Sequence, residues 1–300
     1  MNKQTRTHLG LLGVMQSELN AWSQHYYVTL QTATGEQRTL EMSPDEYNRM
    51  QRTLDSLLIN EDEWIYVVVS VDDQDHLVHW SLFSAPYTLD YLNMLYEFSY
   101  SATDVVRLMQ LIQGLSNVHL KSFLWALFAK ENLAVKFVSV KGSQKHHHAY
   151  PGGLLNHSLE CARITRNALN AISDYPKAEL ELATVAALLH DIGKVQTHSM
   201  DGNLSQEGFS VPHEVYTLKL LTPEIEHLKS QHLQLGIGLE YLLTWKEGKG
   251  FPRLESANII KAADRISTGY DLKQQAFAGK PDYFHFAPAG ENQQIFQRLN

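Results

Sequence analysis

Alternation of apolar and polar side chains with a period of two predicts β-strands in the first part of the chain. Residues 26–31 and 38–42 alternate in this way on either side of a turn at 34–35, which predicts a hairpin. Residues 64–71 and 77–83 are rich in β-branched and aromatic side chains and flank a polar turn, which predicts a second strand pair.

One helix and one further strand complete this region. Ser43, Pro44 and Glu46 have the spacing of a capping box with proline at the first helical position. Residues 9–15 are a candidate strand. This order of elements predicts a small β-barrel-like domain, closed or half-open, over residues 1–85, and an oligonucleotide-binding barrel is one candidate.

The aromatic side chains of these predicted strands have two interpretations. They could stack on the bases of a single-stranded nucleic acid. They could equally form the core of the small domain, which is the commoner role of aromatic residues in a barrel. The residues concerned are Tyr26, Tyr27, Trp64, Tyr66 and Trp80.

Apolar residues recur at three- and four-residue spacing from about residue 87 onward, which predicts an all-α domain over residues 86–280. Residues 281–300 contain two prolines and many polar residues and are predicted to form an irregular or loosely docked tail. The fold class is therefore expected to be α+β. The predicted helices cover residues 103–113, 117–132, 154–172, 177–190, 213–221, 224–245 and 255–270.

Composition narrows the choice of function. A hydrophobic content of 44% in 300 residues is enough for two domains, and a net charge of -8 argues against tight non-specific binding of nucleic acid. Cys161 is the single cysteine and is predicted to be a small buried thiol. No apolar run is long enough to span a membrane, and we expect a cytoplasmic protein without a membrane partner.

The strongest chemical signal is a set of His and Asp residues near the ends of apolar helices. His190 and Asp191 are consecutive, so both can reach one ion only where a helix ends, and Gly193 supplies that end. His157 lies on an earlier predicted helix, and Asp264 follows the apolar run of a late one. Mixed imidazole and carboxylate ligands suit divalent ions, so the sequence predicts a metal site that Mn, Fe, Co, Ni or Mg could occupy.

Each of these residues also has a structural interpretation, as a hydrogen-bonded core histidine or, for Asp264, as half of an ion pair with Arg265. Other catalytic schemes have less support. The sequence contains no G-x-x-x-x-G-K loop, no C-x-x-C pair and no G-x-S-x-G elbow.

Three strings resemble the signature of the HD superfamily of metal-dependent phosphohydrolases. They are GGLLNH at 152–157, LLHDIGK at 188–194 and ADR at 263–265. Within the superfamily, the longer run at 147–155 resembles two subgroups. One is the YhaM-type exoribonucleases, which degrade from the three-prime end and join a barrel to an HD domain. The other is the TraI-type HD domain of conjugative relaxases.

The resemblance implies an enzyme that hydrolyses phosphate esters (EC 3.1 class). It implies His157, His190, Asp191 and Asp264 as ligands of a divalent metal ion, with Asp191 also able to bridge to a second ion. Lys194 would lie beside the substrate phosphate and, with the metal, neutralise charge that develops there.

Four more histidines are candidates for the site. His213 could be a ligand of a second metal ion or could cap a helix, while His146, His147 and His148 could line the site and contact substrate or lie on the surface. Binuclear relatives usually carry a His pair before the last Asp ligand, and residues 243–247 contain none. A mononuclear site is therefore expected.

Three functions remain open at this point. The first is hydrolysis of phosphodiesters in single-stranded nucleic acid, which the resemblance favours. The second is phosphohydrolysis of a nucleotide, which the acidic net charge favours. The third is a catalytically weak module that binds nucleic acid. The sequence does not indicate an oligomeric state.

Overall fold

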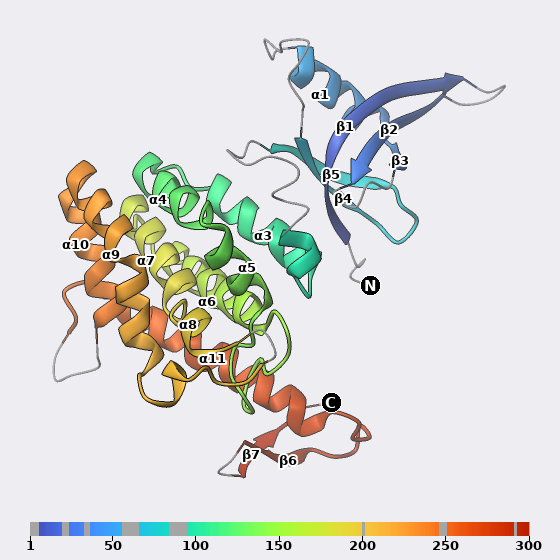
Figure 1. The fold of residues 1–300 in the computed structure, drawn as a ribbon. Helices are drawn as coiled ribbons and strands as arrows, with labels where there is room; N and C mark the ends of the chain where they lie inside the picture. The colour runs from blue at the N-terminus through green and yellow to red at the C-terminus, as the bar shows by residue number, and fades with distance from the viewer. Residues whose placement is uncertain are drawn as a thin grey trace. The chain divides into compact units, whose positions relative to one another are not determined.

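The computed structural model describes residues 6–19, 24–32, 37–55, 66–83, 95–199, 202–245, 251–290 and 293–299. The chain divides into two compact units (Figure 1). The N-terminal unit comprises Met1–Glu97 and Ser101–Gln113, and the C-terminal unit comprises Phe98–Tyr100 and Gly114–Asn300. Among the helices in the described ranges, none has both the length and the hydropathy needed to cross a bilayer.

The N-terminal unit contains a five-stranded antiparallel sheet with the order β3-β2-β1-β4-β5. Its strands are β1 (Arg6–Leu19), β2 (Gln24–Thr32), β3 (Gln37–Met42), β4 (Tyr66–Val71) and β5 (Leu77–Phe83). The two predicted strand pairs are confirmed, as is the additional strand. A closed barrel is not confirmed. In the described residues, the two edges of the sheet are joined by one isolated bridge, between Glu41 and His76.

The core of this unit forms on the face of the sheet that helix α1 (Pro44–Asp55) covers. Ser43 caps α1 as predicted, because its Oγ accepts a hydrogen bond from the Glu46 amide at 3.2 Å. Trp80 is buried in the core and Tyr26 packs against it, so these two aromatics have a structural role. Tyr27 is half-buried. Trp64 and the side chain of Tyr66 lie outside the described residues.

One helix that sequence periodicity assigned to the helical domain clusters with the sheet. Helix α3 (Ala102–Gln113) contacts β1 and belongs to the N-terminal unit. The remaining long helices form the C-terminal unit, which is the helical part of this α+β chain (Figure 1). They are α4 (Val118–Phe128), α5 (Glu131–Ser139), α6 (Gly153–Asn170), α7 (Lys177–Leu189), α9 (His213–Gln231), α10 (Leu233–Thr244) and α11 (Ser256–Phe277).

Helix α7 lies at the centre of the C-terminal unit. It contacts α4, α6, α10 and α11, and every residue from Leu180 to Leu189 is buried. A helix that is apolar on all sides is stable in water only when other helices surround it. This packing brings the C-terminal end of α7, where the HDIGK string lies, into the interior next to α6 and α11.

Several helix boundaries differ from the prediction. His232 divides the helix expected over 224–245 between α9 and α10, and α11 runs past residue 270 to Phe277. The single helix expected over residues 117–132 is two helices, because the extended backbone of Lys130 separates α4 from α5. The break expected near residue 222 is absent, and α9 continues through Pro223 to Gln231. Ile225 and Leu228 continue the buried stripe of this helix past the proline, and their burial offsets the one hydrogen bond that proline removes.

Of the two predictions for the tail, the irregular one is wrong and the docked one agrees with the structure. Residues after α11 form a hairpin of β6 (Phe286–Ala289) and β7 (Gln294–Gln297). Ala287 of β6 is buried against Phe277, and the guanidinium of Arg298 lies 4.6 Å from the centroid of the Phe277 ring. The hairpin is therefore docked on the end of α11.

A buried carboxylate ties α7 to the start of α4. Glu181 accepts hydrogen bonds from the amide and hydroxyl of Ser116, at 2.9 and 2.7 Å, and from the amide of Asn117 at 2.8 Å. Burial raises the pKa of Glu181, but the hydrogen bonds from Ser116 and Asn117 outweigh it and leave the pKa below its usual 4.5. The ionised form is therefore the one that the fold stabilises.

We expect the substitution Glu181→Gln to lower the free energy of unfolding by about 2 kcal/mol at neutral pH, because charge-assisted hydrogen bonds are lost. A lowered carboxyl pKa contributes stability above the unfolded pKa and loses it as pH falls through the folded value. The difference between wild type and variant should thus shrink below pH 4.5. Urea unfolding of both proteins across this range measures it, and a difference that is independent of pH would contradict the assignment.

Candidate metal centre

Two glycines allow residues 146–148, the histidine loop, to pack against the start of α6. Gly152 has a φ of 75°, which glycine adopts without strain. A Cβ on Gly153 would lie 2.0 Å from the carbonyl oxygen of His148, a distance that no side chain tolerates. The GG pair therefore places residues 146–148 beside His157, which is fully buried on the first turns of α6.

The HDIGK string follows the end of α7, as predicted, but Gly193 does not end the helix: its φ of -59° is an ordinary right-handed value and it precedes the short helix α8 (Lys194–Thr197). Helix α7 ends at Leu189, His190 is its C-cap, and α8 begins after a tight turn. Asp191 in this turn is buried. Asp264 comes from α11, and its side chain is 41% exposed, so the site opens to solvent on that side.

The four predicted ligands meet although they come from three distant stretches of the chain. The Nε2 atom of His157 lies 3.3 Å from Asp264 Oδ1 and 3.6 Å from Asp191 Oδ2. The Nε2 atom of His190 lies 3.5 Å from Asp191 Oδ2 and 3.9 Å from Asp264 Oδ1. Two imidazole nitrogens and two carboxylate oxygens thus surround one small volume.

The hydrogen bonds of His190 show which of its nitrogens faces this volume as an acceptor. Its Nδ1 lies 2.8 Å from the carbonyl oxygen of Ala187, which can only accept, so Nδ1 carries the proton. Nε2 then has a lone pair, is buried, and has no hydrogen-bond partner among the described residues. An unpaired buried nitrogen beside two carboxylates is costly, and a bound cation would satisfy all three groups.

The protonation states also suit a metal ion. Burial raises the pKa of Asp191, but the neighbouring His190, Lys194 and His213 together outweigh it, so the pKa lies well below its usual value. Burial raises the pKa of Asp264, but the neighbouring His157 and His190 together outweigh it, so this pKa is lowered as well. Burial lowers the pKa of His157. Ionised carboxylates and neutral imidazoles are the forms that ligate metals.

The other predicted residues also reach the site. Lys194 donates hydrogen bonds to Asp191 Oδ2 at 2.5 Å and to the Gly142 carbonyl at 2.6 Å. His213, the first residue of α9, places Nε2 2.9 Å from Asp191 Oδ1. The structure therefore brings both residues to Asp191, on opposite oxygens.

The histidine loop borders the same volume. The ring centroids of His147 and His148 lie 5.1 and 5.0 Å from that of His157, and the three rings form a second group of donors. Burial, followed by the proximity of Lys194, His157 and His148, lowers the pKa of His147 to about 4. His146 is half-buried, and its carbonyl accepts a hydrogen bond from Gln275.

Sequence reasoning missed three residues next to the ligands. Cys161 was expected to be only a buried thiol, but its Sγ lies 3.7 Å from His157 Nε2 and within the same group of candidate donors. Burial raises the pKa of this thiol. Glu160 and Ser267 form a hydrogen-bonded pair behind His157. Glu160 and Cys161 follow His157 by three and four residues, and Ser267 follows Asp264 by three. This helical spacing places all three on the same helix faces as the candidate ligands and was the signal by which the sequence could have identified them.

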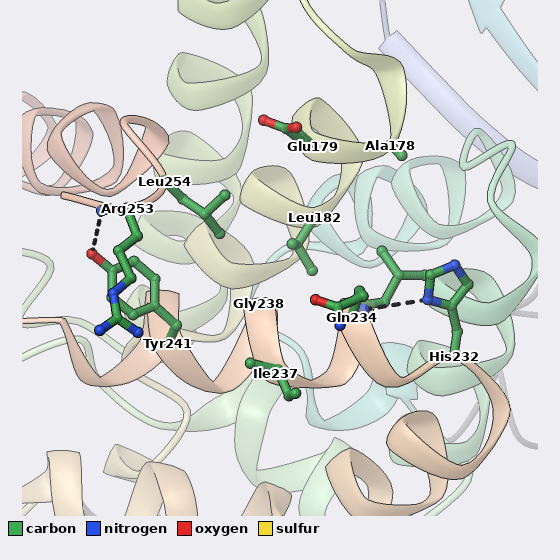
Figure 2. A pocket seen from close by; sticks show the side chains of 11 residues that line it. Ala178, Glu179, Leu182, His232, Gln234, Ile237, Gly238, Tyr241, Arg253 and Leu254 are labelled. Carbon is green, nitrogen blue, oxygen red and sulfur yellow. Dashed lines mark hydrogen bonds between the residues drawn. The ribbon is translucent and has the colours of Figure 1, made fainter.

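A separate pocket lies between the start of α7 and α10 (Figure 2). Its volume is about 500 Å³, and Leu182, Ile237 and Leu254 make much of its lining apolar. Tyr241 accepts a hydrogen bond from the Arg253 amide at 2.8 Å at one side of this pocket. His232, at the other side, caps α10 by accepting a hydrogen bond from the Leu235 amide.

Two family models match the chain. Residues 154–269 match the HD domain, and residues 99–206 match the TraI_2 family, whose description is "Putative helicase". No match was found among curated proteins or among solved structures.

The chain therefore carries an HD-type domain with a relation to the TraI type, as the sequence motifs predicted. HD domains are metal-dependent phosphohydrolases that bind divalent ions, and the His, Cys and Asp cluster of this chain is able to hold one. The predicted closeness to YhaM-type exoribonucleases is not confirmed.

Proposed function

We propose that this HD-type domain hydrolyses phosphodiester bonds of single-stranded nucleic acid. His157, His190, Asp191 and Asp264 would hold one divalent ion. The observation that carries the proposal is the convergence of their donor atoms, at 3.3 to 3.9 Å between imidazole nitrogens and carboxylate oxygens. The unpartnered, buried Nε2 of His190 supports it, since this nitrogen has a lone pair and faces carboxylates.

A divalent ion bound there would lower the pKa of a coordinated water and neutralise charge on the phosphate. The residues of the chain supply the rest of the chemistry. Lys194 holds Asp191 Oδ2 in place and brings a fixed positive charge to the site. Two of its three N–H donors are used by Asp191 and Gly142, which leaves one donor for a phosphate oxygen.

We propose that His213, in its protonated form, donates a proton to the leaving oxygen, which departs as a hydroxyl group, while the neutral ring stays hydrogen-bonded to Asp191. Its side chain is 29% exposed, whereas that of Asp191 is 10% exposed, so His213 lies at the open side of the site. Its hydrogen bond to Asp191 Oδ1 orients the ring. A histidine whose ring is held by a carboxylate and whose position is open to substrate can transfer a proton in the reaction.

The choice of a polynucleotide substrate rests on two observations. The TraI_2 match covers the histidine loop and the HDIGK string. The exposed positions of Asp264 and His213 leave one side of the site open, and a chain that is longer than a nucleotide needs such access. Hydrolysis of a nucleotide is the second candidate, because the net charge of -8 works against a long polyanion.

A substrate panel with Mn, Fe, Co, Ni or Mg tests the proposal. We expect turnover of single-stranded RNA or DNA above that of mononucleotides and cyclic dinucleotides. Binding of single-stranded oligonucleotides should weaken steeply between about 50 and 200 mM salt, because phosphate contacts release counterions. Turnover of mononucleotides without oligonucleotide binding would establish the second candidate instead. No turnover of any member with any ion would contradict both.

A further inference from the structure

The nitrogen of His157 that faces away from the metal centre has a partner of its own. Nδ1 lies 2.9 Å from the hydroxyl of Ser267, and that hydroxyl lies 2.6 Å from Oε2 of Glu160. Ser267 follows Asp264 by three residues on α11, and Glu160 follows His157 by three residues on α6. Helices α6 and α11 contact each other. On each of them one turn carries a candidate ligand, and the residue three positions later belongs to the Ser267–Glu160 pair that supports His157.

The number of available protons decides which group donates in each of these two hydrogen bonds. A carboxylate only accepts, so the single hydroxyl proton of Ser267 is donated to Glu160. The Ser267 oxygen can then only accept from His157, which requires a proton on Nδ1. A neutral imidazole has one N–H, so Nε2 has its lone pair directed toward Asp264 and Asp191.

We propose that Ser267 and Glu160 are positioning residues that hold His157 in the tautomer and orientation needed to ligate a metal through Nε2. The inference deepens the proposed function, because it assumes that His157 is a ligand. His190 has the same Nδ1–H tautomer, but there the backbone carbonyl of Ala187 accepts the hydrogen bond. The two imidazoles thus present equivalent nitrogens, one fixed by a side-chain pair and one by the end of α7.

The same pair connects the ligand to the histidine loop. Oε2 of Glu160 lies 3.4 Å from Nε2 of His148. The amide of His148 donates to Asp271 of α11 at 2.7 Å, and Gln275 also donates to Asp271 at 2.7 Å. Asp271 follows Ser267 by four residues, so one face of α11 holds both the loop and the support of His157.

The first experiment measures the tautomer of His157 in metal-free protein. Nitrogen-15 spectra of histidine-labelled protein distinguish Nδ1–H from Nε2–H, and a His157→Gln variant identifies the signal. We expect Nδ1–H in the wild type. In Ser267→Ala the acceptor is lost, and we expect a mixture of the two tautomers. Nε2–H in the wild type, or an unchanged tautomer in Ser267→Ala, would overturn the inference.

The second experiment measures affinity for Mn²⁺ by competition with a chelator. Loss of the hydrogen-bond partner behind a metal-bound histidine typically lowers the affinity for the metal by about 10- to 100-fold. We expect a loss of this size for Ser267→Ala. Ser267→Thr retains the hydroxyl and should restore most of the affinity. Glu160→Gln removes the charge at constant shape and should give an intermediate loss, which keeps the test available if a change at the buried Ser267 prevents folding.

Ser158→Ala is the matched control. Ser158 is a buried serine on α6 whose hydroxyl has no hydrogen-bond partner among the described residues, so its loss should leave Mn²⁺ affinity unchanged. An equal loss in Ser158→Ala and Ser267→Ala would overturn the positioning role. If the wild type shows the Nδ1–H tautomer but binds no Mn²⁺ or other divalent ion, the proposed function fails while the role of Ser267 in orienting His157 stands.

Discussion

The variant His190→Ala is expected to lose its divalent ion and at least about 10³-fold in kcat/KM while it stays folded. The nitrogen that is removed has no hydrogen-bond partner among the described residues, and Nδ1 bonds only to the Ala187 carbonyl at the end of α7. The fold therefore loses little. A catalytic metal contributes several kcal/mol to stabilisation of the transition state, and each 1.36 kcal/mol corresponds to about tenfold in rate.

Metal analysis of the purified protein and initial rates with the best substrate of the panel measure this effect. His227→Ala is the matched control, since His227 lies on an exposed position of α9 and the residue type and substitution are the same. It should retain metal and activity. A folded His190→Ala protein that keeps both its ion and its turnover would show that hydrolysis does not occur at this centre.

The variant Gly193→Ala, which adds a single methyl group, is expected to lower both stability and turnover through a steric clash. Its Cβ would lie 1.9 Å from the carbonyl oxygen of His213 and 2.5 Å from the amide of Thr217, so the start of α9 must move away. The backbone at Gly193 has a φ of -59°, and the clash is therefore purely steric. Overpacking of this kind costs about 1–3 kcal/mol or more in stability.

Movement of α9 would also separate His213 from Asp191, which are now 2.9 Å apart. A displacement of about 1 Å at a reacting group can cost on the order of 10²-fold in rate. We therefore expect Gly193→Ala to lower both kcat and the midpoint of thermal unfolding. The control is Gly269→Ala on α11, where a Cβ would meet no atom within 4 Å.

Gly269→Ala should keep full activity and gain up to about 1 kcal/mol of stability, because alanine is the better helix former. Thermal unfolding and initial rates of both glycine variants make the comparison. If Gly193→Ala retained wild-type rate and stability, the close approach of α9 to the HDIGK turn would not be a requirement of the site.

Local patterns were sufficient for most of the secondary structure. The alternation at 26–31 and 38–42 predicted β2 and β3 because the side-chain period of a strand is two. The capping signal at Ser43 located the start of α1 for a similarly local reason. The patterns failed where packing overrode them, as at Pro223, which lies inside α9 because the residues after it are buried.

The four candidate ligands were also evident from the sequence, because a buried Asp or His near a helix end needs a partner. Their supports were not. Cys161, Glu160 and Ser267 are ordinary helix residues until α6 and α11 are placed side by side. Helical spacing alone leaves several faces open, and only the contact between helices selects the one that faces the ligands.

The amino-acid order thus specified the strands and helices, the single thiol, and a His and Asp set suited to a divalent ion, because these properties depend on residue type and on short spacings. The packing of α6, α7 and α11 decided that His157, His190, Asp191 and Asp264 share one volume, across more than a hundred residues of chain. It also decided which carboxylates are ionised and which imidazole nitrogens have lone pairs, because burial and neighbouring charge arise only in the folded protein.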